Sequence, residues 1–306
     1  MAATLPLRAA VVEDDDFELS RNTVYKRFRK HKLAVAGIFV LAIMIFVAVF
    51  AHWLAPADPN FIDNAHWNGY PLAPGVAGHL LGSDENGRDL LSRLIFGARI
   101  SLTVAIFAVL MEISIGTVLG ALAGYYGGWI DYIIMRTTDV FLSIPLLPLL
   151  LVLTAIVAAS SSKAALSFGV IVIIIGGLSW PPVARLVRAS FLSLREREYT
   201  EAARALGNND MRIIFRHLLP NAVAPIIVQA TLEVANVIIL ESTLSFLGFG
   251  IQPPTASWGN MLANATSNMA IAWWAAVFPG SCILITVLAI NYMGDGLRDA
   301  LDPNMR

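Results

Sequence analysis

The feature that most constrains this chain is a series of apolar runs, each long enough to cross a lipid bilayer. The first, residues 33–54, contains no Asp, Glu, Lys or Arg. As an α-helix rising about 1.5 Å per residue it reaches roughly 33 Å, which is enough for the ~30 Å hydrocarbon layer. Mostly polar residues precede it, so we expect an uncleaved anchor rather than a cleaved signal peptide.

Five more runs follow, and the sequence therefore predicts an all-α membrane protein with six transmembrane helices. They lie at 100–125, 132–158, 165–185, 222–249 and 271–293. Composition agrees, because 57% of the 306 residues are hydrophobic and 14% are charged, too few to cover a soluble protein of this size. Gly116, Gly120 and Gly124 would let the second span approach its neighbours closely.

The basic residues predict the orientation of these spans. With the N-terminus inside, 17 of the 21 Lys and Arg residues fall on the inner side, and only Arg88, Arg93, Arg99 and Lys163 fall outside. Inner loops of membrane proteins carry such an excess, so we expect both termini to be cytoplasmic. Residues 1–32 would form a cytoplasmic tail, disordered around its acidic stretch at 13–16 and anchored by its basic cluster beside membrane lipid.

Several functions are disfavoured by the residues themselves. A net charge of −1 gives no basis for binding nucleic acid. The five histidines show no metal-ligand spacing, and no phosphate-binding loop is present, so we expect no metal site and no ATPase activity. Ser161, Ser162 and Lys163 could suggest a Ser-Lys dyad, but they form a short turn with no visible partner, and we expect no catalytic residue.

Residues 195–221, between the fourth and fifth spans, predict a helix-turn-helix knuckle. Residues 196–206 favour a helix that stops at Gly207, the residue type that best accepts a left-handed conformation. Asn208, Asn209 and Asp210 offer a turn and an N-cap for a second helix over 211–219, which we expect to end at Pro220.

Two surfaces of the knuckle have distinct expected uses. Small residues in the first helix would allow another protein to approach closely; these are Ala202, Ala203 and Ala205. An apolar face on the second helix would be supplied by Ile213, Ile214 and Leu218. From the residues alone, docking to another protein and resting on lipid headgroups remain equal alternatives.

The knuckle resembles the loop that marks permease subunits of ATP-binding-cassette importers. Glu201-Ala202-Ala203, three further residues, Gly207 and then Leu219-Pro220 reproduce its residue types and spacing. His217 departs from the broad family, which usually has an apolar residue there, but the string 217–221 is similar to the peptide-permease branch. The resemblance implies that the segment 186–221 couples to the ATPases.

Three further strings resemble the dipeptide and oligopeptide permeases. They lie at 82–99, before the second span, at 246–259, after the fifth, and at 294–303, in the C-terminal tail. The resemblance implies a six-span permease domain over 33–306 of the type I, methionine-permease-like fold, with an outer segment at 55–99. It places the protein in the bacterial cytoplasmic membrane.

The resemblance also implies the partners of this chain. They are a second homologous permease subunit, two ATP-binding subunits that hold ATP and Mg, and an extracytoplasmic substrate-binding protein. The solute would be a dipeptide or oligopeptide, and this chain would bind no cofactor. Alternatives that stay open are nickel complexes, glutathione, and an ion-gradient-driven secondary transporter.

A polar stripe marks the fifth span. At 100° per residue one helix face collects Gln229, Glu233, Asn236 and Thr243. An ionised Glu233 facing lipid would cost about 2.5–3.5 kcal/mol, so the stripe should line a passage or bond other helices. For Glu112 and Glu241 we expect packing or pairing.

Two expectations concern the ends of spans. Arg136 and Asp139, three residues apart, should form a helix-end ion pair. Residues 84–99 should form an interfacial helix with an apolar face and a structural duty. A further hypothesis is that the outer face of this segment contacts the binding protein.

Overall fold

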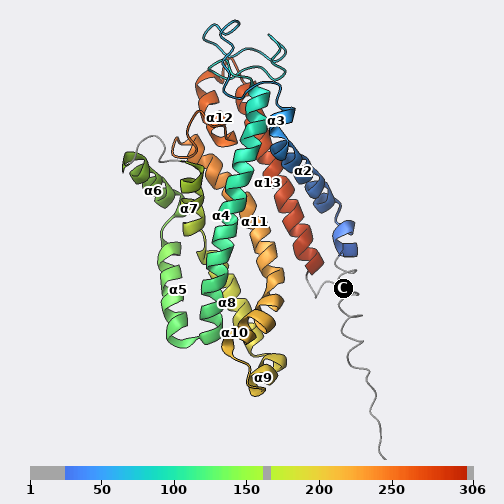
Figure 1. Ribbon diagram of the computed structural model, residues 1–306, viewed down its shortest axis with the longest axis vertical. Coiled ribbons are helices and arrows are strands. Elements are labelled where there is room, and N and C mark those ends of the chain that lie inside the picture. Colours follow the sequence, from blue (N-terminus) through green and yellow to red (C-terminus); the bar gives the residue numbers. More distant parts are fainter. Residues whose placement is uncertain (1–24, 161–166, 302–306) are drawn as a thin grey trace, which may run out of the picture.

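The computed structural model describes residues 25–160 and 167–301 of the chain. Within these ranges the architecture is helical, with only isolated β-bridges. The long helices run side by side along the longest axis of the molecule (Figure 1). In chain order the elements are α2 Lys32–Val49, α3 Ala51–Leu54, α4 Leu90–Tyr126, α5 Gly128–Ser143, α6 Leu146–Ser160, α7 Phe168–Leu178, α8 Pro181–Arg195, α9 Glu198–Ala205, α10 Asp210–Arg212, η1 Ile213–Leu218, α11 Leu219–Phe246, α12 Trp258–Ala265, η2 Thr266–Asn268 and α13 Trp274–Leu301.

Four helical runs in the described chain are long and apolar enough to cross a membrane: α2, α4, the continuous run Asp210–Phe246, and α13. Two bent pairs complete the six predicted spans if each pair counts as one crossing. The bend is 85° between α5 and α6 and 44° between α7 and α8. The spans predicted at 132–158 and 165–185 are therefore broken helices.

Proline explains both breaks. Ile144 ends α5 in an extended conformation, as a residue before proline prefers, and Pro145 follows. Pro181 and Pro182 begin α8, where their missing N–H groups are least costly. The α8 helix then continues to Arg195, so the first ten residues of the predicted coupling segment are the end of a span.

Helix α4 is the central element, and three of its glycines meet α8. A Cβ added to Gly116 would lie 2.6 Å from Val183, and one added to Gly120 would lie 2.5 Å from the Ala184 carbonyl oxygen. Gly124 meets Phe191 in the same way. The close approach predicted from the glycine spacing is confirmed, because a larger residue could not occupy any of these positions without moving α8.

The first turns of α4 belong to this long helix, so the expectation of a separate interfacial helix is wrong. The Asp89 carboxylate caps α4 by accepting the Ser92 N–H at 2.7 Å. Leu90, Leu94 and Ala98 are buried, and the Trp258 indole donates to the Leu94 carbonyl oxygen at 3.2 Å. The expected structural duty is confirmed, since this region packs against α12.

The segment from 55 to 89 is held by buried ion pairs at the end of the molecule opposite α9 (Figure 1). Asp84 accepts from Arg88 at 2.7 Å and lies 3.2 Å from the Arg93 guanidinium. His79 lies 2.9 Å from Asp89. All five side chains are buried, so this network fixes the segment to the start of α4.

The predicted Arg136–Asp139 pair is wrong. Asp139 pairs instead with Arg185 on α8, and Arg136 lies over the Tyr132 ring at 5.8 Å. A second bond between the same helices joins Arg188 to Asp131. These pairs tether α5 to α8. Asp139 pairs with Arg185 rather than with Arg136, its neighbour in sequence, because α8 packs against α5.

Some sequence predictions lie outside the described residues. They concern the tail stretch at 13–16, the Ser161, Ser162 and Lys163 turn, and the last residues of the C-terminal string, 302 and 303.

Candidate coupling and translocation sites

The knuckle, residues 195–221, contains α9 and the turn predicted at Gly207. Gly207 has φ +78°, in the left-handed region. Its N–H donates to the Arg204 carbonyl oxygen at 3.0 Å, and the Asn208 N–H donates to that of Ala203 at 3.2 Å. This pair of bonds is the Schellman motif, so the predicted helix stop is confirmed.

The second half of the knuckle differs from the prediction. Asn209 caps α10 as expected, by accepting the Arg212 N–H at 2.9 Å. The helix does not end at Pro220, because the chain passes through the π-helical turn η1 and continues directly into α11. In this wider turn the Leu219 N–H donates to the Ile214 carbonyl oxygen, and Pro220, which has no N–H, lies within the first turn of α11.

The knuckle is fixed firmly to the spans. Ile213, Ile214 and Leu218 are buried in one apolar cluster with Val187 and Phe191 of α8, as their predicted apolar face requires. The Tyr125 hydroxyl of α4 bonds to Asp210 at 2.7 Å. Any displacement of the knuckle must therefore displace α4, α8 and α11.

The predicted coupling residues fall on different sides of the knuckle. Glu201, Ala202 and Pro220 are exposed, whereas His217 and Leu219 are half-buried. Ala203 is buried, so its assignment to an open alanine surface is wrong, and its small side chain serves packing inside the knuckle.

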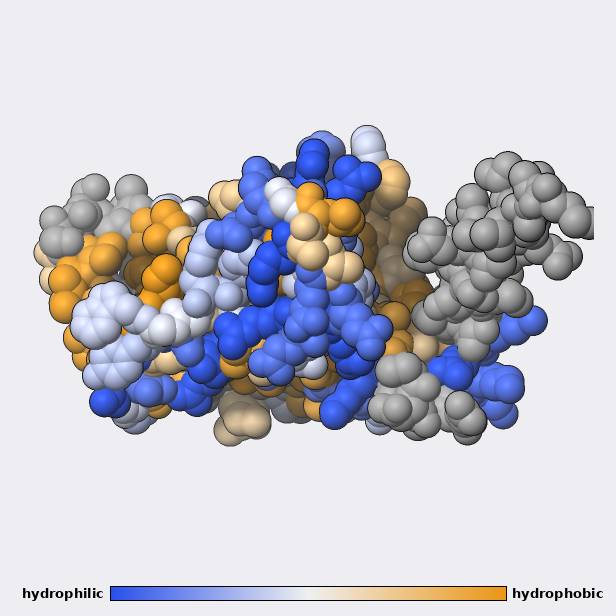
Figure 2. All heavy atoms as spheres, turned by 90° about the horizontal axis from the view of Figure 1, so that it is seen from below, coloured by the Kyte–Doolittle hydropathy of each residue, from blue (hydrophilic) through white to orange (hydrophobic). Residues whose placement is uncertain are grey.

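Three exposed apolar side chains on the knuckle escaped the sequence analysis. Leu206 is 83% exposed, and Met211 and Phe215 are also exposed. Seen from this end of the molecule, hydrophobic residues stand among a largely hydrophilic face (Figure 2). Only Met211 carries a signal in the sequence, because it stands between Asp210 and Arg212, whereas Phe215 directly follows Ile213 and Ile214.

The polar stripe of α11 is brought together only in part. Glu233 accepts from the Gln229 amide at 2.6 Å and from the Asn236 amide at 3.0 Å. Thr243 is not part of this group, because its hydroxyl donates to the Ile239 carbonyl oxygen of its own helix at 2.7 Å. The structure thus gathers three of the four predicted pathway residues.

Glu233 and Asn236 line a cavity of about 500 Å³, which we call the joint cavity. Its other walls come from both helix breaks, including Pro145 between α5 and α6 and Ser179 between α7 and α8. Phe141, Leu178 and Leu240 contribute apolar surface. The joint cavity therefore combines a carboxylate with broken helix ends.

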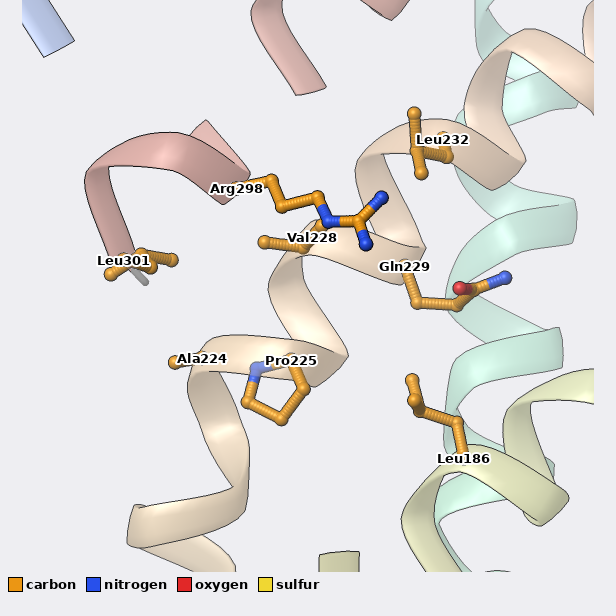
Figure 3. A pocket seen from close by; sticks show the side chains of 8 residues that line it. All are labelled: Leu186, Ala224, Pro225, Val228, Gln229, Leu232, Arg298 and Leu301. Carbon is orange, nitrogen blue, oxygen red and sulfur yellow. The ribbon is translucent and has the colours of Figure 1, made fainter. Parts of the chain in front are cut away.

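A second cavity, of about 420 Å³, contains Gln229. It lies between α8, α11 and α13, and the Arg298 side chain extends from α13 toward α11 across it (Figure 3). Leu186, Pro225 and Val228 supply apolar walls. Because Gln229 bonds to Glu233, one hydrogen-bonded group connects the two cavities along α11.

The remaining two span carboxyls differ in environment. Glu241 is buried and accepts from Ser101 at 3.1 Å and from Ser245 at 2.8 Å, so the expected pairing is observed. Glu112 is also buried, but neither of its carboxyl oxygens has a hydrogen-bond partner within the described residues. Packing alone holds it on α4.

Comparison with known families decides the class of this protein. The profile described as "Binding-protein-dependent transport system inner membrane component" matches residues 116–306, and the "N-terminal TM domain of oligopeptide transport permease C" matches residues 22–74. The chain belongs to this permease family. Its members are membrane components of ATP-binding-cassette transporters, distinct from the ATPase subunits, and work in complex with other transporter subunits. The protein is accordingly a multi-pass inner-membrane permease.

Related permeases cover nearly all of the chain. A glutathione transport system permease protein of Pectobacterium atrosepticum is 43% identical and covers 100% of this chain and 97% of its own. A dipeptide transport system permease protein of Alkalihalophilus pseudofirmus is 41% identical, with 92% and 89% covered. A di/tripeptide transport system permease protein of Pseudomonas aeruginosa is 40% identical, with 92% and 91% covered.

A solved structure supports the fold. The methionine ABC transporter in inward-facing conformations contains a chain that matches this permease with a TM-score of 0.57 at 20% identity. The match covers 70% of this chain and 98% of the other. The predicted methionine-permease-like fold is thereby confirmed, while the placement of both termini in the cytoplasm stays a prediction.

Proposed function

We propose that this permease imports short peptides through a complex with a second homologous permease, two ATPase subunits and an extracytoplasmic binding protein. ATP and Mg are held by the ATPases, and this chain binds no cofactor. The observation that carries the proposal is the knuckle, which exposes Leu206, Met211 and Phe215 and packs against three spans. Peptides are proposed as the solute because the related permeases serve dipeptides, di- and tripeptides, and glutathione, itself a tripeptide.

The proposed mechanism is mechanical. Closure of the ATPases moves the knuckle, and its contacts carry the motion into α4, α8 and α11 as a rigid-body displacement. Both α8 and α11 contribute walls to the joint cavity, so the same displacement changes its opening. Gln229, Glu233 and Asn236 are proposed to line the passage, where they offer hydrogen bonds to a peptide.

The docking surface is tested by placing a charged side chain at Leu206 of the knuckle. Leu206→Glu should abolish co-purification of the ATPase subunits, because Leu206 is 83% exposed and would bury a carboxylate against apolar surface on docking. Leu80→Glu is the matched control, since Leu80 is 65% exposed in the segment at the opposite end. Equal ATPase recovery with both variants would contradict docking at the knuckle.

The solute is tested separately, in proteoliposomes that contain the complete transporter and its binding protein. We expect ATP-dependent accumulation of a labelled dipeptide or of glutathione. If neither the dipeptide nor glutathione accumulates, the assignment of peptides as the solute is contradicted. The result for docking at the knuckle would be unaffected.

A further inference from the structure

An apolar groove, which we call the α4 groove, lies between α4 and the second half of the knuckle. Its volume is about 560 Å³, and one wall is the α4 face from Ile113 to Leu122. The facing wall is formed by four knuckle side chains: Met211, Ile214, Phe215 and Leu219. Among the described residues that line the groove, only Ser114 and Thr117 have polar side chains, and none is charged. The groove therefore suits a hydrocarbon ligand, because a polar ligand would lose its hydrogen bonds to water there.

The α4 groove lies in the half of the membrane nearest the knuckle. Its walls belong to two helical runs that are long and apolar enough to cross a membrane, α4 and Asp210–Phe246. Ile113 and Leu122 are nine residues apart on α4. This length is about 14 Å, close to the ~15 Å of hydrocarbon in one leaflet.

Exposed aromatic side chains mark the headgroup level at the knuckle end of the groove. Tyr126 lies one turn of α4 beyond Leu122 and is exposed, and Trp129 at the start of α5 is exposed as well. Such side chains gather where the hydrocarbon layer meets the lipid headgroups. The groove thus runs from the headgroup level into the hydrocarbon of one leaflet, which is the path of a phospholipid acyl chain.

Two arginines near this end of the groove favour a negatively charged headgroup. Each directly follows a lining residue of the knuckle, and both are exposed: Arg212 and Arg216. The Arg212 guanidinium donates to the Asn208 side-chain oxygen at 3.4 Å. Neither arginine pairs with a carboxylate within residues 25–160 and 167–301. Basic side chains beside an apolar groove at the membrane surface attract anionic lipids.

We propose that the α4 groove binds one acyl chain of an anionic phospholipid, whose headgroup lies against Arg212 and Arg216. The lipid fills space between α4 and the knuckle that the chain itself leaves open, and Met211 and Phe215 cover the acyl chain. Leu206 does not line the groove, so it stays available to the ATPase subunit of the proposed function. The knuckle thus has two separate apolar surfaces, one for protein and one for lipid.

The experiment counts the lipids that the complete transporter retains. The complex is extracted in mild detergent from vesicles of equal parts phosphatidylglycerol and phosphatidylcholine, and its bound lipids are identified by native mass spectrometry. Wild type should retain at least one phosphatidylglycerol that Val118→Trp loses, because Val118 lines the groove and is 58% exposed, so an indole there occupies the space of the acyl chain. Val152→Trp on α6 is the matched control, since Val152 is 57% exposed and lies outside the groove. It should retain the same lipids as wild type.

The headgroup contact is tested by a second pair of variants. Arg216→Gln should lower the preference for phosphatidylglycerol over phosphatidylcholine roughly fivefold, which is the usual effect of one arginine near an anionic membrane surface. Arg197→Gln is the control, because Arg197 is an exposed arginine at the start of α9 that adjoins no lining residue. It should leave the preference unchanged.

Three results would contradict the lipid site. The inference is overturned if wild type and Val118→Trp retain the same lipids, or if Arg216→Gln keeps the preference shown by Arg197→Gln. Loss of the ATPase subunits from Val118→Trp, with lipid retention unchanged, would assign the groove to the ATPase instead. Failure of Leu206→Glu to release the ATPases would contradict the proposed docking, whereas the lipid count tests the α4 groove alone.

Discussion

At the residue scale, Gly207 is required for its backbone rather than for space. An added Cβ would meet nothing within 4 Å, but φ is +78°, where a side chain costs about 1–2 kcal/mol. Gly207→Val should therefore distort the turn and lower peptide uptake per ATP hydrolysed, while membrane insertion continues. Gly207→Asn is the control, because Asn tolerates this conformation. Normal coupling in the Val variant would show that the turn is not needed.

Glu85 gives a pH-dependent prediction at the same scale. Burial and the neighbouring Asp84 carboxylate raise the pKa of Glu85 above its usual 4.5. The folded state thus holds this proton more tightly than the unfolded chain, so the contribution to stability is complete below pH 4.5 and declines as pH rises through the raised pKa. Glu85→Gln should raise the free energy of unfolding at pH 8 by less than about 1 kcal/mol, which would be seen as a higher unfolding temperature. At pH 4 the substitution should leave the unfolding temperature unchanged. An equal effect at both pH values would refute this cause.

At the element scale, the contact between α4 and α8 depends on small residues. Gly120→Ala would place a Cβ 2.5 Å from the Ala184 carbonyl oxygen, and backbone cannot yield as a side chain can. We expect a loss of about 1–3 kcal/mol, seen as a lower unfolding temperature of the purified complex. A Cβ added to Gly280 in α13 would meet no atom within 4 Å, so Gly280→Ala should be neutral or stabilising. Similar unfolding temperatures for both variants would mean that the helices can separate freely.

The elements also show what the sequence could and could not predict. Apolar length identified the spans, and the Gly207 turn followed from one residue type, because both are local properties. The partner of Asp139 was not predictable, since Arg185 is distant in sequence and becomes its neighbour only when α5 packs on α8. The continuation of the helix from the π-helical turn η1 through Pro220 was not predictable for a similar reason: burial of Ile213 and Leu218 favours continuing the helix over the local stop signal.

The joint cavity illustrates the same limit within the candidate site. Helical periodicity placed Gln229, Glu233 and Asn236 on one face of α11, and the structure joins them by hydrogen bonds. Periodicity also included Thr243, which bonds to its own helix. Ser179 could not be found by this reasoning, because it belongs to a different span and reaches the cavity only through the bend between α7 and α8.

At the scale of the whole molecule, the energy source can be tested against ion-driven transport. The knuckle packs against spans that also line the joint cavity, and under the proposed function the work enters there from the ATPase subunits. In proteoliposomes that contain the complete transporter, ATP on the knuckle side should support uptake at an unchanged rate after a protonophore collapses the proton gradient. A proton or sodium gradient without ATP should support none, because nothing then displaces the knuckle. Uptake driven by such a gradient alone would reverse the assignment, since the carboxyl groups of Glu112 and Glu233 would then have to relay the coupled ion.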